Sequence, residues 1–204
     1  MDSTELVIAR TRAWLEAAVI GLNLCPFAKG VHVKGQVACI VSDAVDVESL
    51  QAELARALLA LAAADPEQTD TTLLIHPQVL QDFEDFNQFL AVADDTLQSL
   101  GLEGVLQVAS FHPQFQFAGT APDDVTNATN RSPYPTLHLL REDSIDRAVE
   151  AFPEAETIYE ANMATLQRLG PAGWAALQRH WSAEAVAPAL NVDPTGRGAA
   201  AGED

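Results

Sequence analysis

Two histidines at the ends of apolar segments are the first residues whose type and position suggest chemistry. His76 closes the apolar stretch 72–76, His112 closes 104–112, and each is followed directly by proline. Imidazole titrates near neutral pH, so such a pair can act as general acid and base or can bind a metal ion. The alternative is that each ring only caps a strand end through hydrogen bonds to the backbone.

Arg131 is a candidate for substrate binding because it ends a long stretch without positive charge. Residues 57–130 contain no lysine or arginine, and the bases resume at Arg131. A guanidinium can hold a carboxylate or phosphate through two parallel hydrogen bonds, so we expect Arg131 to bind the anionic part of a small ligand. The structural alternative is a salt bridge to one of the many acidic residues. The side chains predicted to assist Arg131 are Asn127, Asn130, Tyr134, His138 and Arg141. For His138, which lies within an apolar strand, a core position is the alternative.

Cys25 is a candidate nucleophile, between Leu24 and Pro26. A thiol becomes reactive when a neighbouring histidine lowers its pKa, but free cysteine is also a common buried hydrophobic residue. Asp123 and Asp124 add carboxylates that, together with histidines, suit metal-assisted hydrolysis. The chain has no His-x-x-x-His spacing, so the pattern leaves open whether a metal or a cofactor is bound.

The elements that must position these residues alternate between strand and helix. Apolar runs of strand length at 37–41, 72–76 and 104–112 are separated by amphipathic helical patterns at 47–61 and 83–100. Such alternation predicts a single α/β domain with a central, mainly parallel or mixed sheet of about four strands flanked by helices. The fourth strand is expected at 135–141, in a direction that the pattern leaves open.

The predicted topology brings the two histidines to one edge of the sheet. Parallel strands joined by one helical crossover end on the same edge, and ligands of open α/β sheets bind at that carboxyl edge. The segment 113–134 starts there and shows no periodicity. Unstructured loops longer than about 12–15 residues are usually functional or disordered. Because this one contains Phe115, Phe117 and Tyr134 among varied polar residues, we expect an ordered loop that contributes to the site.

Composition limits the partners and the compartment. The 29 acidic against 11 basic residues give a net charge of −18, which repels phosphate backbones and disfavours nucleic acid and anionic membranes as partners. No apolar run approaches the roughly 20 residues needed to span a bilayer, and the N-terminal segment has the pattern of an amphipathic helix. Two cysteines are too few for a disulfide framework. We therefore expect a cytoplasmic protein with one domain at 1–183, whose oligomeric state is open. The Ala-, Gly- and Pro-rich segment 184–204 is expected to be a disordered tail.

Three short segments resemble those of a family of small bacterial proteins, the domain-of-unknown-function family numbered 1415. The likeness is carried by Leu24–Ala28, Phe111–Pro113 and Asn130–Pro135, and it spans nearly all of residues 4–181. The resemblance implies a stand-alone bacterial cytoplasmic protein. It implies no activity and therefore assigns no catalytic residue.

The residues favour a small-molecule enzyme, a hydrolase or transferase that acts on an anionic metabolite. In this hypothesis His76 and His112 provide acid/base or metal chemistry, and Arg131 binds the substrate. The alternative is a non-catalytic ligand-binding or protein-interaction module built from the same loop. Titratable groups that converge in a concave site would favour the enzyme, whereas a flat apolar patch of Phe115, Phe117 and Tyr134 would favour the interaction module.

Overall fold

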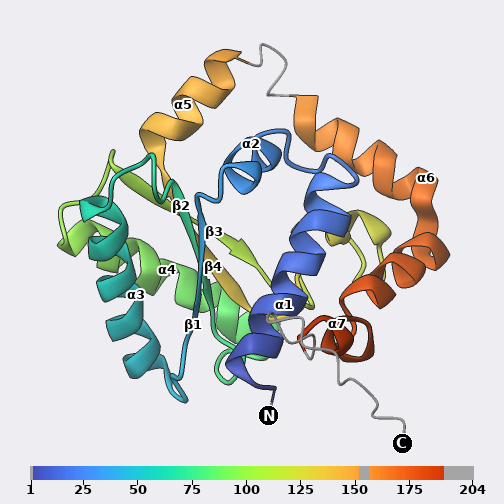
Figure 1. The fold of residues 1–204 in the computed structure, drawn as a ribbon, viewed down its shortest axis with the longest axis horizontal. Coiled ribbons are helices and arrows are strands. Elements are labelled where there is room, and N and C mark those ends of the chain that lie inside the picture. The colour runs from blue at the N-terminus through green and yellow to red at the C-terminus, as the bar shows by residue number, and fades with distance from the viewer. Residues whose placement is uncertain (1, 152–156, 191–204) are drawn as a thin grey trace, which may run out of the picture.

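The computed structural model describes residues 2–151 and 157–190 of the chain. It shows a single α/β domain in which helices cover both faces of a mixed, four-stranded sheet (Figure 1). The predicted fold class is therefore confirmed. Within the described residues, no helix is both long and apolar enough to cross a membrane.

The fourth strand lies inside the sheet, between two strands that the sequence places earlier. The strand order is β1-β2-β4-β3, with β1 parallel to β2 and β4 antiparallel to both of its neighbours. The bounds are Val37–Val41 for β1, Thr71–Ile75 for β2, Leu106–Phe111 for β3 and Thr136–Arg141 for β4. Ile75 of β2 and Phe111 of β3 both pair with Thr136. The carboxyl ends of β2 and β3 are therefore level, one on each side of the start of β4.

Helices α3 (Val47–Ala63) and α4 (Phe83–Ser99) cover one face of the sheet (Figure 1). Each begins at an aspartate N-cap whose side chain accepts hydrogen bonds from backbone N–H groups of the first turn, Asp46 for α3 and Asp82 for α4. Leucines of both helices pack against leucines of β2, β3 and β4. Phe86 of α4 is completely buried in this layer.

The opposite face is covered by the N-terminal and C-terminal helices. The elements on this side are α1 (Thr4–Trp14), the π-helix η1 (Leu15–Ile20), α2 (Ala28–Val33), α6 (Ile158–Gln178), the 3-10 helix η4 (Arg179–Trp181) and α7 (Ala183–Leu190). Trp14 packs edge-on against Phe111 of β3, with ring centroids 5.1 Å apart. The remaining elements are the 3-10 helix η2 (Val125–Asn130) and α5 (Glu142–Ala151). Helix α6 is kinked at Gly170, where φ is +67°.

The predicted disordered tail is wrong for residues 184–190, which belong to α7. This helix packs against α1, and its Val186 is only 8% exposed. The backbone N–H of Ala185 donates to the Ser182 hydroxyl at the start of the helix. Alanine-rich composition is as compatible with a docked helix as with a tail, because alanine has the highest helix propensity. The rest of the predicted tail, 191–204, lies outside the described residues.

Candidate functional site

His76 and His112 lie together at the carboxyl edge, as the repeated strand-ending pattern predicted. They directly follow Ile75 and Phe111, the residues that pair with Thr136. Both rings stack on Phe86, with centroid distances of 5.6 Å for His76 and 5.0 Å for His112. Both residues have 0% exposed surface. The two imidazoles are thus part of the layer between the sheet and α4.

The hydrogen bonds of the two rings hold the turn that joins β2 to α4. Nδ1 of His112 accepts from the backbone N–H of Gln114 at 3.0 Å, so its hydrogen is on Nε2, which donates to the Leu80 carbonyl at 3.2 Å. Nδ1 of His76 lies 3.0 Å from the Val79 carbonyl, which can only accept, so Nδ1 carries the hydrogen. Nε2 of His76 has no hydrogen-bond partner among the described residues.

Burial keeps both histidines neutral. Loss of solvent and, to a smaller extent, the nearby His112 ring lower the pKa of His76 to about 4, although the hydrogen bond to Val79 partly opposes them. Burial also lowers the pKa of His112 below its ordinary value, although hydrogen bonding to Leu80 partly opposes this effect. At neutral pH His112 therefore has both ring nitrogens engaged with the backbone, which matches the structural alternative stated for it.

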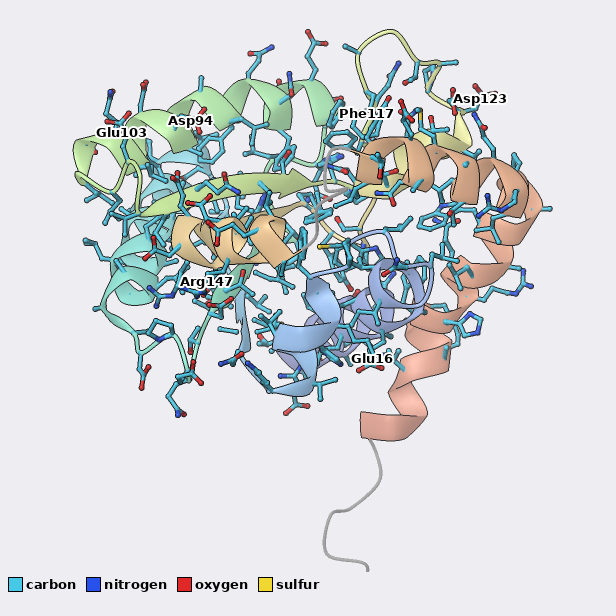
Figure 2. All side chains as sticks on the ribbon, turned by 90° about the horizontal axis from the view of Figure 1, so that it is seen from above. Glu16, Asp94, Glu103, Phe117, Asp123 and Arg147 are labelled. Atoms are coloured by element: carbon cyan, nitrogen blue, oxygen red, sulfur yellow. The ribbon has the colours of Figure 1, made fainter. Side chains whose placement is uncertain are left out.

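A pocket of about 390 Å³ opens at the same edge, between the start of α4 and the loop that follows β3. Figure 2 shows this loop, where Phe117 and Asp123 are labelled, far from Glu103 beyond the other end of α4. The loop supplies prolines, amides and one guanidinium to the pocket, and α4 supplies its first turn. The lining residues are Asp82, Phe83, Glu84, Pro113, Gln114, Gln116, Pro122 and Arg131.

Arg131 is half-buried in the wall of this pocket. Its Nε donates to the Phe115 carbonyl at 3.1 Å and its Nη2 to the Pro122 carbonyl at 2.6 Å, whereas Nη1 has no hydrogen bond within the described part of the chain. No carboxylate oxygen of the described residues lies within 4.0 Å of the guanidinium, so the salt-bridge alternative is not what the structure shows. Burial lowers the pKa of Arg131, the Asp124 carboxylate partly opposes this effect, and the guanidinium stays charged at neutral pH.

Asn127 is the residue that orders the loop. Its side chain is fully buried; Oδ1 accepts from the Phe117 N–H and the Thr120 hydroxyl, and Nδ2 donates to the Ala121 carbonyl. The prediction of an ordered loop is confirmed. Since these three bonds use the amide within the loop, Asn127 has a positioning role. Asn130 likewise donates to the Ser110 carbonyl of β3, at 3.2 Å.

The structure does not bring Tyr134, His138 or Arg141 to the pocket. The Tyr134 hydroxyl donates to Asp2 and accepts from Arg10, on the face covered by α1, and burial raises its pKa above the ordinary value. His138 lies on that same face, where Nε2 is 2.7 Å from the Thr71 hydroxyl and burial lowers its pKa to about 4. Arg141 is at the far end of β4. All three were predicted to assist Arg131 because they are close to it in the sequence, but in the structure they lie away from the pocket.

Cys25 is also separate from the two histidines. It lies in the loop between η1 and α2 and packs at the border of the cluster around Trp14, on the sheet face opposite to Phe86. No hydrogen bond to its sulfur is formed within residues 2–151 and 157–190. Across the same ranges, no three His, Cys, Asp or Glu side chains are grouped so as to hold a metal ion.

Sequence reasoning missed the half of the pocket that α4 contributes. Asp82 and Glu84 follow the turn after β2, and this turn leads away from the same carboxyl edge as the loop after β3. The signal was available, because every loop that leaves the carboxyl ends of parallel strands starts at one edge. The side chains of Gln114 and Gln116 were within the predicted loop but were not singled out.

Comparison with known proteins identifies the chain only at the level of a family. No curated protein and no solved structure matches it. A family model matches residues 6–176, which include β1 to β4, the pocket and most of α6. The match covers far more than half of the chain, and the chain therefore belongs to the family described as "Protein of unknown function (DUF1415)".

Proposed function

We propose that this protein binds a small metabolite through an anionic group at the pocket formed by α4 and the loop after β3. The observation that carries the proposal is the Arg131 guanidinium, which lines the pocket with Nη1 free and no carboxylate of the described residues within 4.0 Å. Its other two nitrogens donate to loop carbonyls, which fixes the direction of the free edge. The Asp124 carboxylate attracts Arg131 but lies beyond 4.0 Å, so a ligand carboxylate or phosphate would provide the close partner at Nη1.

Ligand binding without catalysis is favoured over acid/base chemistry by the surroundings of the histidines. Neither imidazole is exposed, and both nitrogens of His112 already bond to the backbone. A general acid or base must reach the proton that it transfers. The observation that favours an enzyme as the second candidate is the buried, unpartnered Nε2 of His76.

The protein-interaction alternative has less support from the aromatic residues of the loop. Phe115 packs between Phe83 and Phe117, and Phe117 packs on Tyr159 of α6, with centroid distances of 5.0–5.8 Å. Tyr134 lies on another face of the molecule. These rings connect the loop to its neighbours and do not form one flat patch. The net charge of −18 disfavours nucleic acid as a partner. The proposed setting is a bacterial cytoplasm.

Calorimetric titration of the purified protein with inorganic phosphate and with short mono- and dicarboxylates tests the proposal. We expect saturable binding of at least one class, weakened about tenfold or more in Arg131→Ala and partly recovered in Arg131→Lys, because an ammonium lacks the planar fork. Arg56→Ala is the matched control, since Arg56 lies on α3 outside the pocket. If Arg131→Ala lowers only the melting temperature and leaves the affinity unchanged, the guanidinium is structural and the proposal is wrong.

A further inference from the structure

The charges that line the pocket do not suit a ligand that is purely anionic. Arg131 is the single basic residue of the lining, whereas Asp82 and Glu84 contribute two carboxylates. A dianion such as phosphate would gain one favourable partner and share the pocket with two like charges. Like-charge contacts of this kind are how binding sites reject the wrong partner. The lining therefore selects a ligand that carries positive as well as negative charge.

The opposite charges of the pocket are not already paired with each other. No salt bridge within 4.0 Å joins Arg131 to Asp82 or Glu84. One oxygen of Asp82 accepts from the backbone N–H groups of Glu84 and Asp85, which leaves its second oxygen available, and the Glu84 carboxylate has no hydrogen bond within the described residues. A guanidinium and two carboxylates thus share one pocket without neutralising one another. A molecule that bridges them would complete both sets of hydrogen bonds.

The rest of the lining fits a molecule with a charged head and a short apolar body. Phe83, Pro113 and Pro122 provide apolar walls. Nε2 of Gln116 donates to the Thr120 carbonyl, which fixes that amide and leaves its oxygen as an acceptor. A volume of about 390 Å³ lies at the small end of the range for metabolite sites, which suits a compact ligand.

We infer that the ligand is a small zwitterion with the head group of an α-amino acid. Its carboxylate binds the free edge of Arg131, and its ammonium group binds Glu84 and the second oxygen of Asp82. This inference rests on the proposed function and narrows the ligand to one chemical class. The inference predicts that amino acids bind more tightly than simple carboxylates or phosphates. The proposed function alone does not distinguish these three classes of ligand.

A thermal-shift screen with the twenty common L-amino acids, followed by calorimetry, tests the inference on the full-length protein. The best amino acid is compared with two matched analogues, the carboxylic acid without the amino group and the amine without the carboxylate. We expect the amino acid to bind at least tenfold more tightly than either analogue. Glu84→Gln should weaken amino-acid binding by about tenfold while leaving the affinity for the deaminated acid equal or higher.

The control variant is Asp85→Asn, which removes a charge from the same first turn of α4 but not from the pocket lining. It should leave amino-acid affinity unchanged. If Asp85→Asn lowers the affinity as much as Glu84→Gln does, the effect of Glu84 comes from the overall charge of the helix end and not from contact with the ligand, and the inference is wrong. If the deaminated acid binds as tightly as the amino acid, and Arg131→Ala abolishes both, the inference is wrong and the proposed function stands. If neither binds and phosphate does not bind, both are wrong.

Discussion

β4 has an arginine near each end, and the two arginines use the same group differently. Arg141, at the carboxyl end of β4, is 9% exposed, and its Nη2 donates to the carbonyls of Leu61, Ala64 and Thr69. Arg131, five residues before β4, is half-buried, donates to two loop carbonyls and retains a free Nη1 in a pocket. Neither forms a salt bridge within the described residues.

The difference shows that the nearby backbone, more than the abundance of acids, determines what an arginine does in this protein. The last carbonyls of a helix have no partner within the helix and carry the negative end of its dipole, so a guanidinium placed there is held by them. Arg141 meets the end of α3 in this way. All three bonds of Arg141 come from Nη2, and its Nε is buried without a partner among the described residues. A loop offers fewer convergent carbonyls. Both arginines keep an unused donor, but only Arg131 lines a pocket, where its Nη1 can meet a ligand. Ligand binding is therefore expected only at that edge of the sheet.

The largest effect that distinguishes the two ends of β4 is a loss of stability, which we expect from Arg141→Ala. The variant leaves carbonyls at the end of α3 without their side-chain donor, and buried groups that lose a partner cost about 1–3 kcal/mol each. We expect the free energy of unfolding, measured by urea denaturation, to fall by about 3 kcal/mol. Ligand affinity at the Arg131 pocket should not change. A loss of affinity without a loss of stability would contradict the assignment of the two ends.

The second-largest expected effect is a pH dependence of the free energy of unfolding, which originates from His76 at the carboxyl edge of the sheet. Burial lowers the pKa of His76 to about 4 in the folded protein. As the pH falls, His76 is therefore protonated in the unfolded chain at a higher pH than in the folded protein. His76 is neutral in both states above about pH 6.5, so its full contribution is present there. As the pH falls below 6.5 stability is lost at up to about 1.4 kcal/mol per unit, and the loss is complete below about pH 4.

This pH dependence is measured as the difference between wild type and His76→Asn, whose amide can still donate to the Val79 carbonyl. Between pH 6.5 and pH 5 the wild type should lose about 2 kcal/mol more of its unfolding free energy than the variant. His138 contributes a similar slope to both proteins and cancels in the comparison. Exposed His180 provides the control, because His180→Asn should keep the wild-type slope. Equal slopes in wild type and His76→Asn would show that His76 is not buried as a neutral group.

Local patterns predicted the elements of the fold but not all of their neighbours. The alternation of apolar runs with helical periodicity predicted β1 to β3 and helices α3 and α4, because each pattern is a property of adjacent residues. The insertion of β4 between β2 and β3 depends on pairing across the sheet, for which no residue of β4 carries a local signal. The docked α7 was missed for a related reason, since Val186 is buried only by its contact with another element.

The edge of the sheet that carries the candidate pocket could be located from the sequence, whereas most of the lining of that pocket could not. Two strand endings identified the edge, and the long stretch without lysine or arginine identified Arg131. The hydrogen-bond partners of the imidazoles could not be predicted. They are the backbone carbonyls of Val79 and Leu80, and a backbone carbonyl is present whatever the residue type. Arg141 failed as a site residue because the six residues of β4 separate its ends by about 20 Å.

The smallest effect contrasts two helix caps at the same edge of the sheet. Asp46 caps α3 and Asp82 caps α4, and replacing an aspartate N-cap by alanine costs about 1 kcal/mol. Asp46→Ala and Asp82→Ala should therefore lower the unfolding free energy by similar amounts in urea titrations. Only Asp82 lines the pocket, so Asp82→Ala should also weaken amino-acid binding severalfold, whereas Asp46→Ala should leave it unchanged. If both variants alter affinity equally, binding follows the stability of the whole edge. If neither alters it, the second oxygen of Asp82 does not contact the ligand, and Glu84 alone would have to balance its positive charge.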